Sequence, residues 1–169
     1  MNDHKIKELT EAGLMTALVF AGITFFKIPN PFNGYSHLGD SFIFLSVLIL
    51  GKKRGAMASG VGGALADLLG GFGQWALPTF IIKAGMAYIL GMTMERQKTA
   101  TNISWIPGAI LGSIFQVFGY TLSKLLMYGD KAALATLPNV ILQSGFGIVM
   151  AFILLLAMKK TPVGKRIFS

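Results

Sequence analysis

Polar side chains recur within otherwise apolar stretches of this sequence, and their spacing groups them. Gln116, Tyr120 and Lys124 are four residues apart, which places them on one face of a helix. Asn139 and Gln143 repeat that spacing further along the chain. Amide, hydroxyl and ammonium groups fix the orientation of a small polar ligand by hydrogen bonding, and aromatic faces add stacking area. The pattern therefore favours recognition of a small, ring-containing solute.

A second polar stretch, residues 30–40, separates two apolar runs and reads Asn-Pro-Phe-Asn-Gly-Tyr-Ser-His-Leu-Gly-Asp. Ionisable groups in or near membrane spans cost free energy, so they are functional candidates by default. We expect this stretch to help build a ligand pocket with polar groups from later helices. The candidate substrate-binding residues are Asn33, Tyr35, His37, Asp40, Asp67, Trp75, Lys83, Gln116, Tyr120, Lys124, Asn139 and Gln143.

A purely structural role is the alternative for several of these residues. Asp67 could pair with Lys83, and Lys124 could extend its ammonium group to the lipid headgroups. Gln143 could hydrogen-bond a neighbouring helix. Lys83, Gln116 and Gln143 lie deeper in their apolar runs, where reaching the headgroups is harder, and this depth favours a pocket.

Roles in the fold also remain open for residues nearer the membrane boundary. Asp40, with Ser41, could cap the helix that follows. Tyr35 and Trp75 could be aromatic residues of the membrane interface rather than the wall of a pocket. For His37, a satisfied polar contact is more common than metal ligation.

Catalytic and metal-binding patterns are not found in this sequence. It has no cysteine, two histidines and seven carboxylates, and no Ser/His/Asp arrangement or carboxylate pair at a convincing spacing. We therefore expect neither a metal nor another cofactor, and no enzymatic activity.

The composition is that of an integral membrane protein. Of 169 residues, 53% are hydrophobic, and the mean hydropathy is +0.63. The net charge of +8 comes from short basic clusters between apolar runs, as expected of loops that flank membrane spans. Nucleic acid is therefore not an expected partner, whereas the lipid bilayer is.

We expect an all-α bundle of six transmembrane helices in a single membrane domain, residues 1–169. The predicted helices cover residues 6–28, 41–50, 56–69, 76–94, 104–128 and 133–158. Pro29 and Pro31 end the first helix, since proline lacks a backbone donor and disfavours helical geometry in the residue before it. The second and third helices are short enough for a re-entrant hairpin, but the basic turn between them would then be buried, so six spans are preferred.

The distribution of lysine and arginine predicts the orientation. Basic residues gather in the N-terminal segment, at 52–54, in the connector at 96–98 and in the C-terminal tail, whereas the alternate loops hold only Lys27 and Lys131. By the positive-inside rule both termini are cytoplasmic and residues 30–40 face outward.

The first helix carries a stripe of small residues, Gly13, Ala17 and Ala21. Such stripes let two helices approach closely in a membrane. Packing inside the protein is the alternative, and the third helix has the same pattern at positions 56, 60 and 64.

Four segments give the chain a resemblance to a known family. They are Tyr-Ser-His-Leu-Gly-Asp-Ser at 35–41, Leu-Gly-Lys-Lys-Arg-Gly-Ala at 50–56, Gly-Gly-Ala-Leu-Ala-Asp-Leu-Leu-Gly-Gly at 62–71 and Pro-Thr-Phe-Ile-Ile-Lys-Ala at 78–84. The chain resembles the S components of energy-coupling factor (ECF) vitamin transporters, in the riboflavin-type branch that includes proteins assigned to hydroxymethylpyrimidine or pyridoxine.

This resemblance implies a six-helix subunit of a prokaryotic plasma membrane that captures a vitamin on its outer side. Its implied partners are a transmembrane T component and two ATP-binding-cassette ATPases, and its implied mechanism is toppling in the membrane. Ala17-Leu-Val-Phe-Ala21 matches the family's Ala-x-x-x-Ala docking motif, which makes Gly13, Ala17 and Ala21 the predicted docking residues. The absence of a phosphate-binding loop agrees with ATP hydrolysis by the partners. Hydroxymethylpyrimidine or pyridoxine is the favoured ligand, and riboflavin or another B vitamin is the alternative.

Two other classes of protein are alternatives. A small membrane enzyme acting on lipid would use Asp40, Asp67 and His37 as acid and base, but these residues lack a motif spacing. A channel or secondary transporter would place polar residues along the full depth of the bundle, whereas here they stop at the outer half. A vitamin-binding transport subunit remains the preferred function.

Overall fold

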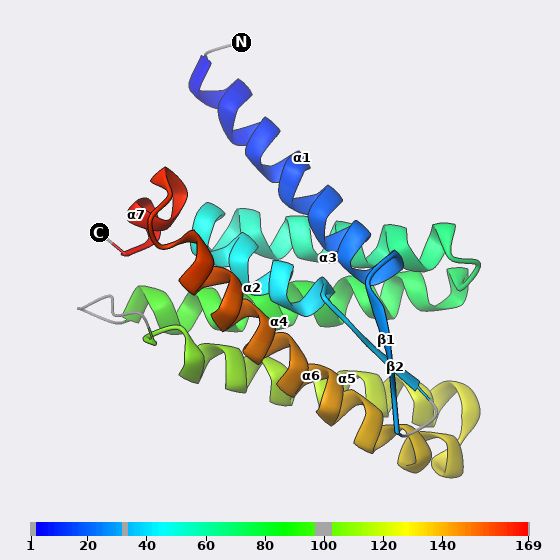
Figure 1. Cartoon of the computed structure of the whole chain (residues 1–169). Coiled ribbons are helices and arrows are strands. Elements are labelled where there is room, and N and C mark those ends of the chain that lie inside the picture. The colour runs from blue at the N-terminus through cyan, green and yellow to red at the C-terminus, as the bar shows by residue number, and fades with distance from the viewer. Residues whose placement is uncertain (1–2, 32–33, 97–102, 169) are drawn as a thin grey trace.

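The computed structural model describes residues 3–31, 34–96 and 103–168, which are almost entirely helical (Figure 1). Seven α-helices, one 3-10 turn and a two-stranded hairpin make up this part of the chain. In order they are α1 (Asp3–Thr24), β1 (Lys27–Asn30), β2 (Gly34–His37), α2 (Gly39–Leu50), α3 (Lys52–Leu69), η1 (Gly73–Trp75), α4 (Ala76–Arg96), α5 (Ile106–Tyr128), α6 (Asp130–Met158) and α7 (Pro162–Phe168).

Helix α2 lies at the centre of the bundle. It contacts α1, α3, α4 and α6, and nine of its twelve residues are buried, which explains why it is apolar on nearly every side. Around it, α1 packs on α3, and α3, α4, α5 and α6 follow one another in contact. Phe44 of α2 packs on Trp105, just before α5, with ring centroids 5.9 Å apart. In a bilayer, van der Waals packing of such side chains and hydrogen bonds between helices hold the bundle together, because lipid is as apolar as the core.

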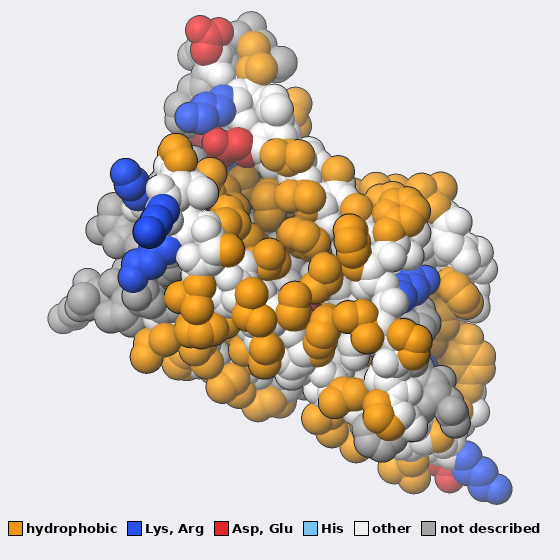
Figure 2. Space-filling view, in the orientation of Figure 1, with side chains coloured by type: hydrophobic (Ala, Val, Ile, Leu, Met, Phe, Trp, Pro, Cys, Tyr) orange, Lys and Arg blue, Asp and Glu red, His pale blue; other side chains and the backbone are white. Residues whose placement is uncertain are grey.

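The two ends of the bundle differ in the elements they carry. In Figure 1 the junction of α2 and α3 lies at the same end as both chain termini and α7, and the hairpin, the α3–α4 connection and the α5–α6 turn lie at the other end. Figure 2 shows hydrophobic side chains spread over the middle of this face and a group of lysine and arginine side chains at the end near α7. This arrangement matches a protein whose middle faces lipid.

The helices differ in how well they could cross a bilayer. Three segments of the described chain are long and apolar enough: Gly73–Arg96, Ile106–Tyr128 and Asp130–Met158. The apolar helix α2 is shorter, at twelve residues. The structure thus supports an all-α membrane protein, and a count of six spans remains a prediction.

The predicted end of the first helix, Ile28, is wrong. Helix α1 ends at Thr24, and Lys27–Asn30 forms strand β1, which pairs antiparallel with Gly34–His37. Pro29 accounts only for the non-helical geometry of Ile28. The earlier end accompanies the strand pairing, which engages the backbone from Lys27 onward. The polar stretch is therefore largely one arm of a hairpin.

The predicted starts of the second and third helices also need correction. Asp40 was a candidate cap for α2, but Leu38 holds the cap position, no side chain caps the helix, and Asp40 lies within it. Helix α3 begins at Lys52 instead of Ala56, because Gly51 alone makes the turn with a left-handed φ of 79°.

The C-terminal tail contains a helix that was not predicted, α7. The Thr161 hydroxyl accepts a hydrogen bond from the backbone nitrogen of Gly164 at 3.1 Å, and Pro162 occupies the first helical position. A threonine cap followed by proline is a recognised start signal, so the sequence did contain the information for this helix.

Candidate functional site

A cavity of about 690 Å³ opens at the end of the bundle that carries the hairpin. This volume is within the usual range for a small-molecule pocket. Its walls come from α1, β2, α3, α4, α5, α6 and the η1 segment, so most of the helices contribute. The lining residues are Ile23, His37, Asp67, Phe72, Gln74, Trp75, Thr79, Lys83, Gln116, Tyr120, Lys124, Tyr128, Ala132, Ala135, Thr136, Asn139, Val140 and Gln143.

Nine of the twelve candidate binding residues line this one cavity. They are His37, Asp67, Trp75, Lys83, Gln116, Tyr120, Lys124, Asn139 and Gln143. Of the other three, Asn33 lies outside the described residues, and Tyr35 is placed only by its backbone, opposite Pro29 in the hairpin. Asp40 does not line the cavity but lies behind its wall. Their proximity supports a shared site, and their contacts with a ligand remain a prediction.

Lys83 and Gln116 line the floor of the cavity, and with Asp40 behind them they form a closed hydrogen-bonded group. Lys83 Nζ donates to Asp40 Oδ1 and to Gln116 Oε1, both at 2.5 Å. Gln116 Nε2 in turn donates to Asp40 Oδ2 at 2.8 Å. The exposed fractions of the three side chains are 2% or less. At such burial the charges of Lys83 and Asp40 need each other and these hydrogen bonds to offset the loss of water. Asp40 therefore holds the two floor residues, Lys83 and Gln116, in a fixed position, and we call the three side chains the buried triad.

Helix α6 completes the surroundings of the buried triad. Ser144 Oγ accepts a second hydrogen bond from Gln116 Nε2 at 2.9 Å, and Ser41 Oγ donates to the Gly147 carbonyl at 3.1 Å. A Cβ at Gly147 would lie 2.6 Å from the Cβ of Asp40, so only glycine lets α2 approach α6 this closely. The earlier alternative that Asp67 pairs with Lys83 is wrong, because the lysine is paired with Asp40.

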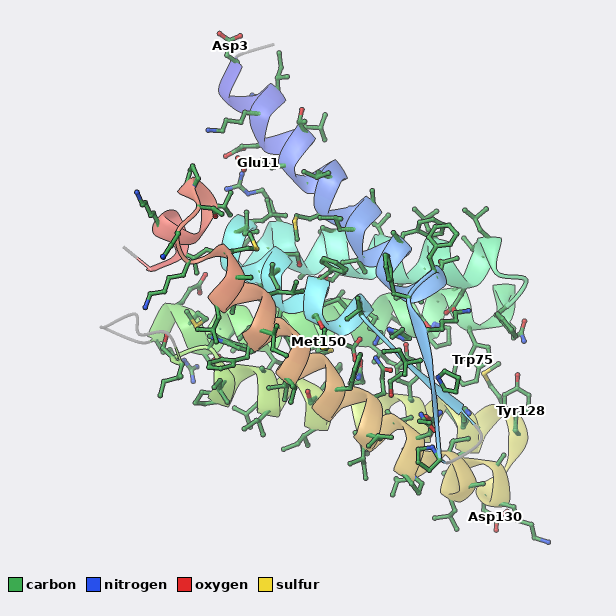
Figure 3. All side chains as sticks on the ribbon, in the orientation of Figure 1. Asp3, Glu11, Trp75, Tyr128, Asp130 and Met150 are labelled. Atoms are coloured by element: carbon green, nitrogen blue, oxygen red, sulfur yellow. The ribbon has the colours of Figure 1, made fainter. Side chains whose placement is uncertain are left out.

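Aromatic side chains form one wall, at the end where Figure 3 places Trp75 and Tyr128. The Trp75 ring lies 6.1 Å from that of Tyr120 and 6.0 Å from that of Tyr128, and the second pair is stacked with 23° between the planes. Lys124 Nζ lies 5.9 Å from the Trp75 ring, and Lys83 Nζ lies 5.4 Å from the Tyr120 ring. The wall offers flat rings that are already fixed in position.

Two functional candidates were missed from the sequence although one had a clear signal. Tyr128 continues the four-residue spacing of Gln116, Tyr120 and Lys124, so it belongs to the same helical face. Thr79 accepts a hydrogen bond from the Tyr120 hydroxyl at 3.3 Å, a contact between two helices that no local spacing indicates.

The hairpin is tied to α6 by side-chain amides. Gln143 Oε1 accepts a hydrogen bond from the His37 backbone nitrogen at 2.8 Å, and Gln143 Nε2 lies 3.2 Å from both the His37 carbonyl oxygen and its Nδ1. Asn30 Nδ2 donates to Asn139 Oδ1 at 2.5 Å. These contacts hold the hairpin over one side of the cavity, and we call them the hairpin clamp.

His37 is neutral at physiological pH. Its pKa is lowered to about 4, mainly by burial; the negative charge of Asp40 opposes this shift, and the positive charges of Lys83 and Lys27 add to it. A neutral imidazole has one nitrogen that accepts, which suits the donor Nε2 of Gln143.

Among the described residues, no group of three or more His, Cys, Asp or Glu side chains could hold an ion. The polar groups present are suited to hydrogen bonding with an organic ligand.

The small-residue stripe of α1 faces outward, unlike that of α3. Gly13 and Ala17 are exposed and Ala21 is half-buried, and a Cβ at Gly13 would meet nothing within 4 Å. A Cβ at Gly60 of α3 would instead lie 3.0 Å from the Phe80 ring. Internal packing thus explains the glycine of α3 and does not explain that of α1. Docking by the α1 stripe remains a prediction.

Comparison with known proteins identifies the family. The family model for the S component of the ECF-type riboflavin transporter matches residues 3–160. The thiamine precursor transporter HmpT of Lactococcus lactis subsp. cremoris (strain MG1363) is 32% identical over 165 residues, which cover 96% of this chain and 94% of that protein. An uncharacterised protein of Pyrococcus woesei is 38% identical over 126 residues, covering 73% of this chain and 82% of that protein.

These matches argue against the alternative of a small membrane enzyme acting on lipid, since both the family and HmpT are named as transporters. The chain belongs to the family of S components of ECF-type riboflavin transporters.

Proposed function

We propose that this protein captures a small ring-containing vitamin or vitamin precursor in the cavity above the buried triad. The observation that carries this proposal is one cavity with a fixed polar floor, an aromatic wall and a hairpin along its side. Such a site can fix the edge of a polar ring by hydrogen bonds and its face by stacking.

The cavity faces the outside of a prokaryotic plasma membrane in this proposal. The start of α3, with Lys53 and Arg54, and the end of α6, next to Lys159, lie opposite the hairpin (Figure 1), and by the positive-inside rule we assign that end to the cytoplasm. Six spans then follow from the alternating direction of α1 to α6. Helix α2 measures only about 18 Å, and the hairpin before it extends the chain toward the outer surface.

Hydroxymethylpyrimidine is the favoured ligand, with pyridoxine next. HmpT, which matches nearly the full length of this chain, is named as a transporter of a thiamine precursor. The cavity volume alone does not distinguish hydroxymethylpyrimidine from riboflavin, because about 690 Å³ would also admit riboflavin. Riboflavin or another B vitamin therefore stays the alternative.

Delivery requires partners in this proposal, namely a transmembrane T component and two ATPase subunits. The exposed stripe of Gly13, Ala17 and Ala21 is the proposed docking surface, and a shallow apolar groove between α1 and α3 begins beside it, with Met57 in its wall. Close helix contact on this face would allow the S component to topple and bring its cavity to the cytoplasmic side.

Ligand identification tests the proposal most broadly. The protein is purified in detergent and denatured, and mass spectrometry identifies any ligand that is released. Calorimetry then measures the affinity of the purified protein for that ligand. A water-soluble vitamin or precursor with a dissociation constant below about 1 μM, roughly −8 kcal/mol, is the expected result. Failure of every such compound to bind at that affinity would refute vitamin capture.

A further inference from the structure

The shallow groove between α1 and α3 exists because the two helices diverge. They are in tight contact at Gly62, where a Cβ would lie 2.8 Å from the Thr16 carbonyl oxygen and 2.9 Å from the Val19 Cβ. Toward its N-terminus α1 runs away from the bundle (Figure 1), and a Cβ at Gly13 would meet nothing within 4 Å. A hollow of about 350 Å³ is left between the helices, and we call it the α1–α3 groove.

The wall of the α1–α3 groove is apolar over most of its length. Leu9 and Met57 are exposed on its two sides, and Val61 continues the wall toward the middle of α3. The hydroxyl of Thr16, which also lines the groove, already donates to the Ala12 carbonyl oxygen at 2.9 Å. A water molecule needs two or more polar partners, which such a wall does not offer. A hydrocarbon chain is therefore the occupant that suits the groove.

Two basic side chains lie at the cytoplasmic end of this groove in the proposed orientation. Lys53 and Arg54, in the first turn of α3, belong to its lining, and no acidic residue of the described chain does. Arg54 Nη1 lies 2.7 Å from Glu8 Oε1, which offsets the charge of Arg54. Lys53 forms no salt bridge within residues 3–31, 34–96 and 103–168. A positive charge thus remains where the groove reaches the lipid headgroups, and it complements an anionic group.

We propose that the α1–α3 groove binds one anionic phospholipid, with an acyl chain against Met57 and Val61 and the phosphate beside Lys53. From Lys53 to Val61 the helix rises about 12 Å, so the groove runs from the headgroups into the region of the lipid tails. The inference rests on the proposed membrane orientation and does not depend on vitamin capture. Gly13 belongs both to the groove and to the proposed docking stripe, so the lipid covers part of that surface in the free subunit.

The headgroup, more than the acyl chain, selects this lipid. An acyl chain gains little by moving from the bilayer into the groove, because lipid tails are as apolar as the wall. A basic residue near the membrane surface favours an anionic lipid about fivefold, which is equivalent to about 1 kcal/mol. The site should therefore distinguish lipids that share their acyl chains and differ in net charge.

Native mass spectrometry of the purified full chain in detergent tests the proposal with phosphatidylglycerol and phosphatidylcholine of identical acyl chains. The wild type should retain one molecule of phosphatidylglycerol at least about fivefold better than phosphatidylcholine. Lys53→Gln removes the unpaired charge and should abolish most of that preference. Gly13→Leu places a side chain in the groove, where its Cβ has room, and should reduce the retention of both lipids.

Lys159→Gln is the matched control, because Lys159 follows the end of α6, is exposed and lies outside the groove. It should keep the wild-type preference, and unfolding midpoints verify that each variant is folded. Equal retention of the two lipids by the wild type, or an unchanged preference in Lys53→Gln, would overturn the inference. Equal effects of Lys53→Gln and Lys159→Gln would show diffuse attraction instead of a site, and full retention by Gly13→Leu would exclude the groove.

Calorimetry with vitamins on the same proteins separates this inference from the proposed function. Lys53 and Gly13 do not line the vitamin cavity, so both variants should bind vitamin as the wild type does. A wild type that binds a vitamin and retains no lipid would refute the lipid site alone. A wild type that retains phosphatidylglycerol and binds no vitamin would refute vitamin capture alone.

Discussion

Lys83 Nζ lies 2.5 Å from Asp40 Oδ1, with both side chains shielded from solvent, and this ion pair joins α4 to α2 beneath the cavity. Gln116 bridges the same two residues from α5. The atoms that form the floor of the site therefore also hold three helices together, and changes to them should alter stability and ligand binding in separable ways.

Replacing Lys83 with Met should destabilise the protein strongly, because it leaves the buried Asp40 carboxylate without its cation. Breaking a buried pair costs about 3–5 kcal/mol, whereas removing both charges is often nearly neutral. The double variant Asp40→Asn/Lys83→Met should thus unfold at a higher temperature than Lys83→Met and still bind vitamin weakly. Thermal unfolding in detergent and calorimetry measure the two effects. A double variant no more stable than the single one would contradict this account of the triad.

Gly147→Ala should disturb the same floor from the side of α6. The added methyl group would lie 2.6 Å from the Asp40 Cβ and would have to push α2 away, at a cost of about 1–3 kcal/mol. Gly145→Ala is the control, because its Cβ would meet nothing within 4 Å and alanine favours a helix by up to about 1 kcal/mol. We expect a lower unfolding midpoint and weaker binding for Gly147→Ala alone. Similar behaviour of the two variants would argue against the close contact.

The stability of the hairpin clamp should fall in mild acid. The folded pKa of His37, about 4, lies below its ordinary value of 6.5, so between these pH values the unfolded chain binds more protons than the folded chain. Stability is therefore greatest above about pH 6.5 and decreases as the pH falls toward 4, by at most about 1.4 kcal/mol per pH unit.

Unfolding midpoints across this pH range, in the wild type and in His37→Gln, isolate the contribution of the imidazole from that of the carboxylates. The variant should lose less stability than the wild type on acidification. An identical pH dependence in both proteins would show that protonation of His37 does not limit the clamp.

Bulky residues on the α1 stripe should separate binding from transport. Ala17→Trp and Ala21→Trp are expected to leave the vitamin affinity unchanged, since neither residue lines the cavity, and to abolish uptake in cells that contain the T component and ATPases. Ile110→Trp, at an exposed position of α5, is the control and should affect neither property. Equal loss of binding and uptake in the Ala17 variant would refute a docking role.

The helices and the polar face of α5 could be predicted from the sequence because both depend on local periodicity. Gln116, Tyr120 and Lys124 share a face through helix geometry alone, and extension of the same rule would have included Tyr128. The membrane class followed equally directly from hydropathy and the placement of basic residues.

The contacts between distant segments could not be predicted in this way. Two carboxylates, Asp40 and Asp67, were available to Lys83, and only the relative register of α2, α3 and α4 decides which one pairs with it. Pro29 indicated where a helix must end but not that four residues on each side of a turn would pair as a hairpin. Both features depend on tertiary packing, which local patterns do not encode.

The central claim, that the cavity above the buried triad is the vitamin site, is tested most directly by calorimetric titration of the purified protein with hydroxymethylpyrimidine. We predict a dissociation constant below about 1 μM for the wild type and binding at least about tenfold weaker for Gln116→Ala, with Ile110→Trp unchanged. Absence of binding to the wild type, or equal affinity in the wild type and Gln116→Ala, would contradict the account.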